Sequence, residues 1–145
     1  MTQSMEDNKL NAVEFYRMAF EGDPKGAVER FVGSEYIQHN PSVGDGVAGF
    51  IHYFERMREE YQIKEINFLR VIAEGDLVAL HTRQMWPEEE YVTMDFFRFD
   101  EAGKIIEHWD AIQRVPEESM NANTMFWASR VCLLYTSDAA DDSLR

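Results

Sequence analysis

Apolar residues recur at helical spacing through the first part of the chain. This spacing predicts three helices, over Asp7–Phe20, Pro24–Val32 and Val47–Tyr61. The pair formed by Asp23 and the following proline is typical of a helix start. Aspartate caps the free amide groups there, and proline fits the first helical position.

The hydrophobic period changes to two at residue 63. Four strands are expected, at about 63–73, 77–86, 91–99 and 104–113. The short loops between them indicate an antiparallel meander, and a short extended piece over Glu35–Gln38 precedes the third helix. Helices followed by strands indicate an α+β fold. We expect the sheet to curl over the three helices as a cone and to enclose an apolar pocket.

Length and composition restrict the class of protein. A chain of 145 residues with 45% hydrophobic and 28% charged residues supports one globular core. The net charge of −13 argues against nucleic acid or an anionic membrane surface as partner, because both favour basic patches. No signal peptide is recognisable, and no apolar run approaches the roughly 18 residues of a membrane span. We expect a soluble, cytoplasmic protein.

The end of the chain differs from the rest. Residues 132–145 show neither the helical nor the two-residue spacing of apolar residues. They resemble the translation of an adapter used to prepare DNA libraries. We expect a single domain over residues 1–131 and interpret 132–145 as adapter read-through, which indicates an environmental (metagenomic) DNA source. A disordered tail is the alternative. Cys132, the single cysteine, lies in this segment, so we assign no thiol chemistry.

Two aspartates stand in strands where aspartate is disfavoured, Asp95 and Asp110. If Asp100–Gly103 is the hairpin loop, Asp95 lies opposite His108 and Asp110 lies opposite Thr93. The two carboxylates are then diagonal neighbours on one face. Two carboxylates and an imidazole on an apolar face shift one another's protonation, as acid–base catalysis requires. A solvated edge carrying ordinary acids is the alternative.

Five other polar residues are candidates for contact with a ligand. His39 and Asn40, with Tyr36 upstream, lie at a turn beside the expected pocket mouth, where pocket and capping roles are both open. His81 and Arg83 share one strand parity, and a bulge would decide whether His81 faces the pocket.

Aromatic residues and missing motifs narrow the chemistry further. We expect Trp86 and Phe97 to shape a hydrophobic pocket. The histidines and aspartates lack the short spacing of a metal site, and no phosphate loop, nucleophile elbow or dinucleotide fingerprint is present. We therefore expect neither a metal nor a cofactor.

Three segments carry a family resemblance when they are read together with the order of elements. They are Glu35–Pro41, Met94–Phe99 and Gly103–Asp110. With them the chain resembles the SnoaL-like branch of the NTF2-like superfamily over about residues 9–126. The resemblance implies a cone-shaped fold with a deep apolar pocket, usually as a homodimer packed through the sheet. SnoaL itself is a polyketide cyclase that performs an intramolecular aldol condensation without a cofactor, and its acid/base aspartate matches Asp110.

The hypothesis from these residues is cofactor-independent acid–base catalysis on a small hydrophobic carbonyl compound. Asp110 would remove a proton α to the carbonyl, and His108 or Asp95 would tune or relay that proton. The tyrosine, histidine and asparagine of the turn (residues 36, 39 and 40) would donate hydrogen bonds to the enolate oxygen.

Two alternatives stay open. The chain is also similar to limonene epoxide hydrolases, which use two aspartates that match Asp95 and Asp110. Those enzymes carry an arginine two residues before the first aspartate. Here that position is Thr93, and Arg83 would have to substitute from the neighbouring strand. The other alternative is a small-ligand binding protein without turnover.

Overall fold

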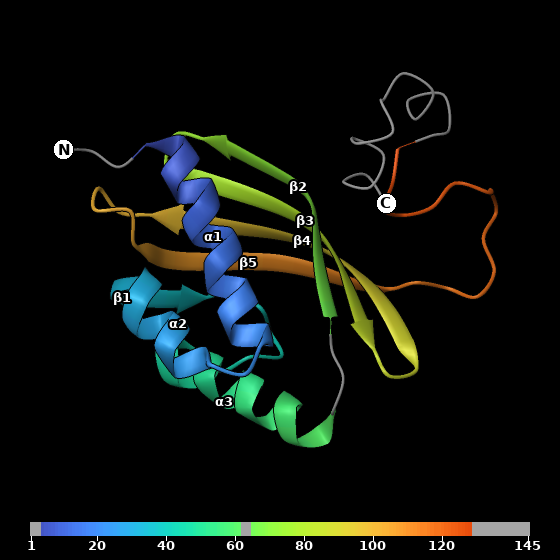
Figure 1. The fold of residues 1–145 in the computed structure, drawn as a ribbon, viewed down its shortest axis with the longest axis horizontal. Coiled ribbons are helices and arrows are strands. Elements are labelled where there is room, and N and C mark those ends of the chain that lie inside the picture. The colour runs from blue at the N-terminus through green and yellow to red at the C-terminus, as the bar shows by residue number, and fades with distance from the viewer. Residues whose placement is uncertain (1–3, 62–64, 129–145) are drawn as a thin grey trace.

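The computed structural model describes residues 4–61 and 65–128 of the chain. Within them, three helices and five strands form an α+β fold, which is the predicted fold class (Figure 1). The fifth strand is the predicted extended piece before the third helix. The elements are α1 Met5–Phe20, α2 Pro24–Phe31, β1 Val32–Gln38, α3 Gly46–Glu60, β2 Glu65–Glu74, β3 Leu77–Trp86, β4 Glu89–Phe99 and β5 Ile105–Arg114. The first residues of the predicted strand 63–73 and all of 132–145 lie outside the described residues, so the interpretation of the tail stays a prediction.

Each helix begins at a capping side chain. Asp23 caps α2 by accepting a hydrogen bond from the amide of Gly26, with Pro24 at the first helical position, as the sequence predicts. Ser4 caps α1 in the same way through the amide of Asp7, and at the start of α3 Asp45 accepts from the amide of the adjacent Gly46. These local signals explain why the predicted helices are confirmed to within a few residues.

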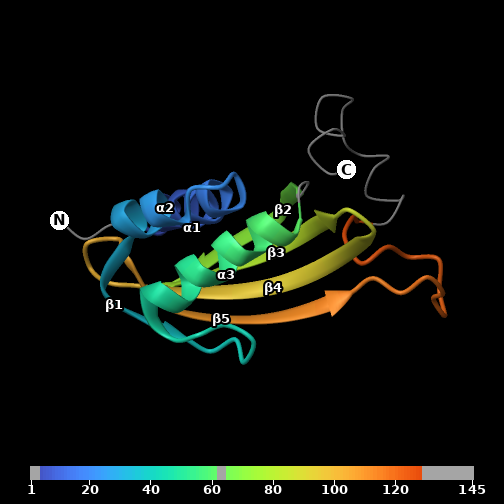
Figure 2. The ribbon, with the colours of Figure 1, turned by 90° about the horizontal axis from the view of Figure 1, so that it is seen from below.

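The five strands form one sheet in the order β1-β5-β4-β3-β2. The last four strands are the predicted antiparallel meander. β1 pairs with β5 in parallel, which makes the sheet mixed and corrects the expectation of a purely antiparallel sheet. Figure 2 shows the helices on one face of a curved sheet. The parallel pairing joins segments far apart in sequence, so the local pattern over Glu35–Gln38 indicated only an extended piece.

The core consists mainly of aromatic side chains between the helices and the sheet. Phe15 is fully buried, with its ring stacked 4.7 Å from Phe50 and edge-on at 5.7 Å from Phe97. Polar residues enter this core on the inward positions of the sheet, where Thr82, Gln84, Thr93, Asp95 and His108 are all buried. Buried polar groups need partners, so this part of the interior is the place to look for a site.

The register of β4 and β5 differs from the predicted one at two points: Phe99 pairs with Ile105 where Lys104 was predicted, and a bulge between Arg98 and Phe99 adds a second residue. Asp95 pairs with Asp110, and Phe97 pairs with His108. The predicted pairing of Asp95 with His108 is therefore wrong by two residues. Because side chains alternate with a period of two, this shift leaves the same residues on the same face. It places the two aspartates directly opposite each other instead of diagonally.

The Asp100 side chain holds the loop that lies next to the bulge. Its Oδ1 accepts hydrogen bonds from the amides of Ala102 and Lys104, and its own amide donates to the Lys104 carbonyl. Gly103 supplies the positive φ of 76° that ends the turn. A side chain bonded to the backbone, which hydrophobic periodicity does not report, thus sets the register of the site.

Replacing Asp100 with alanine is expected to lower the free energy of unfolding by about 1–2 kcal/mol, because two loop amides lose their acceptor. Urea denaturation measures this change. Glu101→Ala, an exposed substitution in the same loop, is the control and is expected to change stability by less than about 0.5 kcal/mol. An equal loss in both variants would contradict a specific role for the Asp100 side chain.

The face of the sheet away from the helices carries exposed apolar side chains. Ile72 is 62% exposed, and Met94 and Phe96 are each nearly half exposed. This is the face through which the family resemblance implies a homodimer, and that pairing stays a prediction. None of the helices in the described ranges is long and apolar enough to cross a membrane.

Candidate functional site

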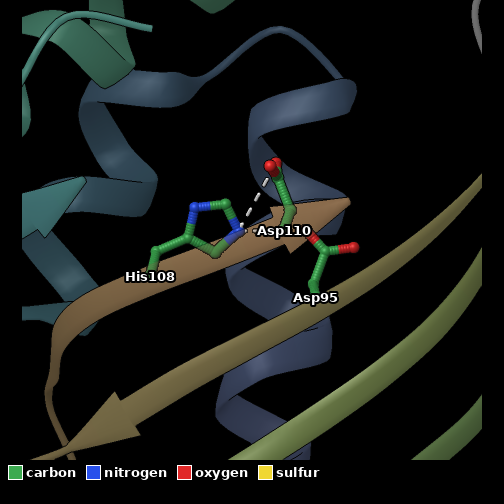
Figure 3. Close-up of side chains that lie close together, drawn as sticks. All are labelled: Asp95, His108 and Asp110. Carbon is green, nitrogen blue, oxygen red and sulfur yellow. Dashed lines mark hydrogen bonds and ion pairs between the residues drawn. The ribbon is translucent and has the colours of Figure 1, made fainter. Parts of the chain in front are cut away.

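Asp95, His108 and Asp110 converge on the face of the sheet that the helices cover (Figure 3). β5 contributes His108 and Asp110, and β4 contributes Asp95. The Nε2 atom of His108 lies 2.9 Å from Oδ1 of Asp95 and 3.9 Å from Oδ2 of Asp110. The sheet therefore brings together the three groups that the sequence analysis identified. The two carboxylates belong to residues that pair directly across β4 and β5.

Asp95 is a buried acceptor whose two oxygens are both occupied. The Tyr16 hydroxyl donates to Oδ1 at 2.5 Å, and the Thr93 hydroxyl donates to Oδ2 at 2.6 Å. Thr82 shares a further hydrogen bond of 2.6 Å with Thr93. A carboxylate held by this many groups cannot turn toward a ligand without breaking the network.

Hydrogen-bond geometry indicates where His108 carries its protons. Gln38 Oε1 accepts from the backbone amide of Asn40 and also lies 2.9 Å from Nδ1 of His108. On the other side, Nε2 faces Asp95 Oδ1 and the Tyr16 hydroxyl, whose single hydrogen goes to Asp95. Both ring nitrogens face acceptors, and this pattern fits an imidazolium paired with the Asp95 carboxylate.

Asp110 is the member of the trio that can meet a ligand. Burial raises the pKa of its carboxyl, and the charge of Asp95 adds to the rise. Two groups lower this pKa: the Asn40 amide, which donates a hydrogen bond of 2.9 Å, and the nearby His108. The pKa still stays above that of an ordinary aspartate. A carboxylate with a raised pKa is a stronger base, which suits proton abstraction.

A cavity of about 530 Å³, here called the outer cavity, opens between α3 and the sheet beside Asp110. Its aromatic lining comes from Tyr53, Tyr61, Trp86 and Tyr91. Asp110 and Glu89 are acidic members of the lining, and no lysine or arginine of the described residues borders it. The size suits a small organic ligand, and the lining favours an uncharged one.

A second space of about 30 Å³, the inner cavity, continues from the outer one. The two cavities share Asn40, Tyr53, Gln84, Asp110 and Ile112. Tyr16 and His108 border the inner cavity only, and Asp95 borders neither. The inner cavity has room for about one water-sized group. Asp110 therefore stands between the space for a ligand and the buried His108.

Two buried tyrosines surround the trio and remain protonated. Burial raises the pKa of Tyr16 and of Tyr36 far above that of a free phenol, and the negative charge of Asp95 adds to both rises. Both hydroxyls are therefore available as donors at any ordinary pH. The Tyr16 hydroxyl donates to Asp95, as described above, whereas Tyr36 borders neither cavity.

The predicted ligand-contacting residues fall into different places. Asn40 and Trp86 border the outer cavity, as expected. Tyr36 and Phe97 lie behind the site in the core, with the Phe97 ring stacked 4.7 Å from that of His108. Their contribution to the pocket is therefore indirect, through the packing of His108.

His39 does not face the cavities. Its ring stacks on Trp109 at 4.7 Å, and its Nε2 lies 2.9 Å from Glu107 Oε1. Trp109 and Glu107 occupy the β5 positions whose parity is opposite to that of His108. The expectation that His39 binds an enolate oxygen is corrected by this placement, because the turn sends its side chain to the other face of the sheet.

His81 and Arg83 also lie on the face away from the helices. The loop between β3 and β4 comprises two residues, not the four of the sequence prediction, and Leu80 pairs with Asp95. His81 accepts from Arg70 through Nδ1 and donates through Nε2 to the carbonyl of Met125. Their predicted contact with a ligand in the pocket is corrected, because the parity of β3 points both residues away from it.

Sequence reasoning missed four residues with polar side-chain groups that border the inner cavity, namely Tyr16, Gln38, Tyr53 and Gln84. Gln84 carried a usable signal, since it is polar at an inward position of a strand and is as unexpected there as the aspartates. The two tyrosines carried no comparable signal, because a tyrosine on the apolar stripe of a helix is equally typical of a core.

The trio also offers three possible metal ligands, whose atoms lie within 4.8 Å of one another. The surrounding hydrogen bonds argue against that use. Both oxygens of Asp95 accept from hydroxyl groups, and His108 Nε2 is paired with Asp95. A cation would have to displace these protons, so the donor set fits a proton network better than a metal centre.

Comparison with known proteins is consistent with this geometry. The sequence profile described as a SnoaL-like domain matches residues 12–108. No curated protein matches the chain in sequence.

Several solved structures share the fold. IdmH from Streptomyces antibioticus, a candidate polyketide cyclase, has a TM-score of 0.65 at 15% identity, over 72% of this chain and 91% of its own. A candidate ketosteroid isomerase from Kribbella flavida has a TM-score of 0.64 at 13% identity, over 86% and 91%. AclR from Streptomyces galilaeus, a candidate hydroxylase, has a TM-score of 0.64 at 20% identity, over 76% and 91%. At these identities the likeness establishes the fold alone.

Proposed function

The chain belongs to the SnoaL-like domain family, and on that premise we propose that it is a cofactor-independent acid–base enzyme acting on a small hydrophobic carbonyl compound. One observation carries the proposal. Asp110 has a raised pKa and borders both the outer cavity and the inner cavity. Structural neighbours named as a cyclase and as an isomerase support the same class of chemistry.

The reaction begins with a proton transfer to Asp110. The carboxylate removes a proton from the carbon next to the carbonyl, and the electron pair of the C–H bond moves to form an enolate. The enolate carbon then attacks a second carbonyl, as in an aldol cyclisation, or takes the proton back at another carbon, as in an isomerisation. In both cases the proton held by Asp110 is returned, so that no oxidant or external cofactor is consumed.

The Asp95–His108 pair supports the base from behind. His108 is 3% exposed, and its Nε2 lies 3.9 Å from Asp110 Oδ2. A positive charge at this distance lowers the pKa of Asp110 and so opposes part of the rise that burial causes. Asp95 holds the imidazole in place through the other hydrogen bond of Nε2. We therefore treat both as positioning residues and Asp110 as the catalytic residue.

The epoxide hydrolase alternative gains no support from the geometry. In limonene epoxide hydrolases an arginine bridges the two aspartates of the site. Thr93 occupies the expected arginine position and donates to Asp95. Arg83 pairs with Glu90 on the far face of the sheet. A binding protein without turnover remains the competing proposal, and measurement of turnover separates the two.

The test uses 2-tetralone, a bicyclic ketone with exchangeable α-protons, in deuterated buffer. We expect the protein to accelerate loss of the α-proton signals in the NMR spectrum relative to buffer alone. A series of β,γ-unsaturated cyclic ketones tests isomerisation in parallel. If the protein binds these ketones and accelerates neither reaction, it is a binding protein and the proposed function is wrong.

The raised pKa of Asp110 also predicts a pH profile. The base works only when it is deprotonated, so kcat/KM for α-proton exchange should fall as the pH drops through that pKa. We expect the midpoint of this acid limb above 3.8, the ordinary value for an aspartate side chain. Rates measured between pH 4 and pH 8 locate it. A rate that stays constant down to pH 4 would exclude Asp110 as the base.

A further inference from the structure

Two polar side chains that face the cavities have no role in the proton network. Gln84 is 7% exposed, projects from β3 and borders both cavities. Tyr53 projects from α3 and borders the same two cavities. Within residues 4–61 and 65–128, neither the Gln84 amide nor the Tyr53 hydroxyl has a hydrogen-bond partner. The Gln84 amide stays accessible from the cavities, so a ligand or a water that enters them can satisfy it.

The other donors around the inner cavity each already make at least one hydrogen bond. Tyr16 donates to Asp95, and Asn40 donates to Asp110. Both nitrogens of His108 face acceptors, and the Gln38 amide lies 3.4 Å from the hydroxyl of Tyr36. Gln84 and Tyr53 differ from these groups because, among the described residues, their side chains make no hydrogen bond, and both lie next to the base.

The sizes of the two cavities show how a ligand would be oriented. The inner cavity, at about 30 Å³, admits an oxygen atom but no ring, whereas the outer cavity holds about 530 Å³. A ketone fits with its carbonyl oxygen in the inner cavity and its apolar body against Trp86 and Tyr91 in the outer one. The α-carbon of such a ligand is then next to Asp110, which borders both spaces.

We propose that Gln84 and Tyr53 form the carbonyl-oxygen subsite of this pocket and that its ligand is an uncharged ring ketone. The inference rests on the proposed function and deepens it. The Gln84 amide and the Tyr53 hydroxyl donate to the carbonyl oxygen, and the same bonds strengthen as negative charge develops there. An acidic lining that lacks lysine and arginine among the described residues disfavours a carboxylate or phosphate. This assignment replaces the earlier one of Tyr36 and His39, which do not border the cavities.

The experiment compares the binding of 2-tetralone with that of tetralin, the same ring system without the oxygen. Quenching of tryptophan fluorescence reports both dissociation constants, because Trp86 lines the outer cavity. We expect the wild-type protein to prefer the ketone by about tenfold or more. Gln84→Leu, which keeps the volume and removes the amide, should reduce this preference about tenfold and leave the affinity for tetralin unchanged. Tyr53→Phe should reduce it in the same direction and is the second variant if Gln84→Leu does not fold.

Gln113→Leu is the matched control. Gln113 is exposed and lies at the opposite parity of β5 from Asp110, so its loss should not change the preference for the ketone. Gln84→Leu and Tyr53→Phe variants that keep the wild-type preference would overturn the subsite, as would a wild-type protein without any preference. Loss of the preference in both variants without any α-proton exchange by the wild type would keep the subsite and reject the proposed enzyme.

Discussion

Asp110→Asn is expected to lower the rate of α-proton exchange by about 10²–10⁴-fold, while the protein stays folded. Asparagine retains the size and one oxygen of the side chain but cannot accept the substrate proton. The hydrogen bond from Asn40 can still be accepted by the amide oxygen, so the geometry of the pocket should persist. NMR exchange rates with 2-tetralone measure the loss, and ketone affinity should change much less than the rate.

Thermodynamic linkage adds a second readout for this variant. The folded-state pKa of Asp110 is raised, so the folded protein holds this proton to higher pH than the unfolded chain does. Stability from this site is therefore present at low pH and is lost as the pH rises through the folded-state pKa. At neutral pH, Asp110→Asn should be at least as stable as the wild type.

A matched carboxylate far from the cavities is the control for this prediction. Asp76 is exposed and pairs with Arg98 in a turn, so Asp76→Asn should leave the exchange rate unchanged. If Asp110→Asn retained more than half of the wild-type rate, the proton would be taken by another group and the mechanism would be wrong.

The elements of the fold were predictable because their signals are local. Asp23 and Pro24 indicate the start of a helix by their own chemistry. Alternation of apolar and polar residues indicates a strand wherever one face of the sheet is buried. The aspartates at 95 and 110 were found for a related reason, since each breaks the alternation at an inward position. Hydrophobic pattern therefore located the catalytic candidate before any contact was known.

The remaining features depend on contacts that a linear pattern does not encode. The register of β4 and β5 depends on the loop that Asp100 holds, and the parallel pairing of β1 joins segments about half the chain length apart. The role of Tyr16 depends on which side chain lies opposite its helix face. The prediction that Asp95, His108 and Asp110 share one face of the sheet is still correct, because the register of β4 and β5 was wrong by an even number of residues.

Asp95→Ala is expected to lower the free energy of unfolding by about 3–5 kcal/mol. Asp95 is 1% exposed, and the variant leaves the buried His108 without its carboxylate partner. It also leaves the hydroxyls of Tyr16 and Thr93 without their acceptor. Urea denaturation at neutral pH measures the loss, which should greatly exceed any change in Asp110→Asn. The difference in stability between the two variants distinguishes a positioning carboxylate from a catalytic one in the same pair of opposed residues.

A double-mutant cycle tests whether the loss comes from the pair itself. Breaking one partner of a buried ion pair costs far more than replacing both with apolar groups. The variant Asp95→Ala combined with His108→Leu should therefore be less destabilised than the sum of the two single variants, by about 1–3 kcal/mol. Strict additivity would mean that Asp95 and His108 do not stabilise each other. The imidazolium inferred from the contacts of Gln38 and Tyr16 would then be wrong, and Asp110 would lack the positive charge that opposes the rise of its pKa.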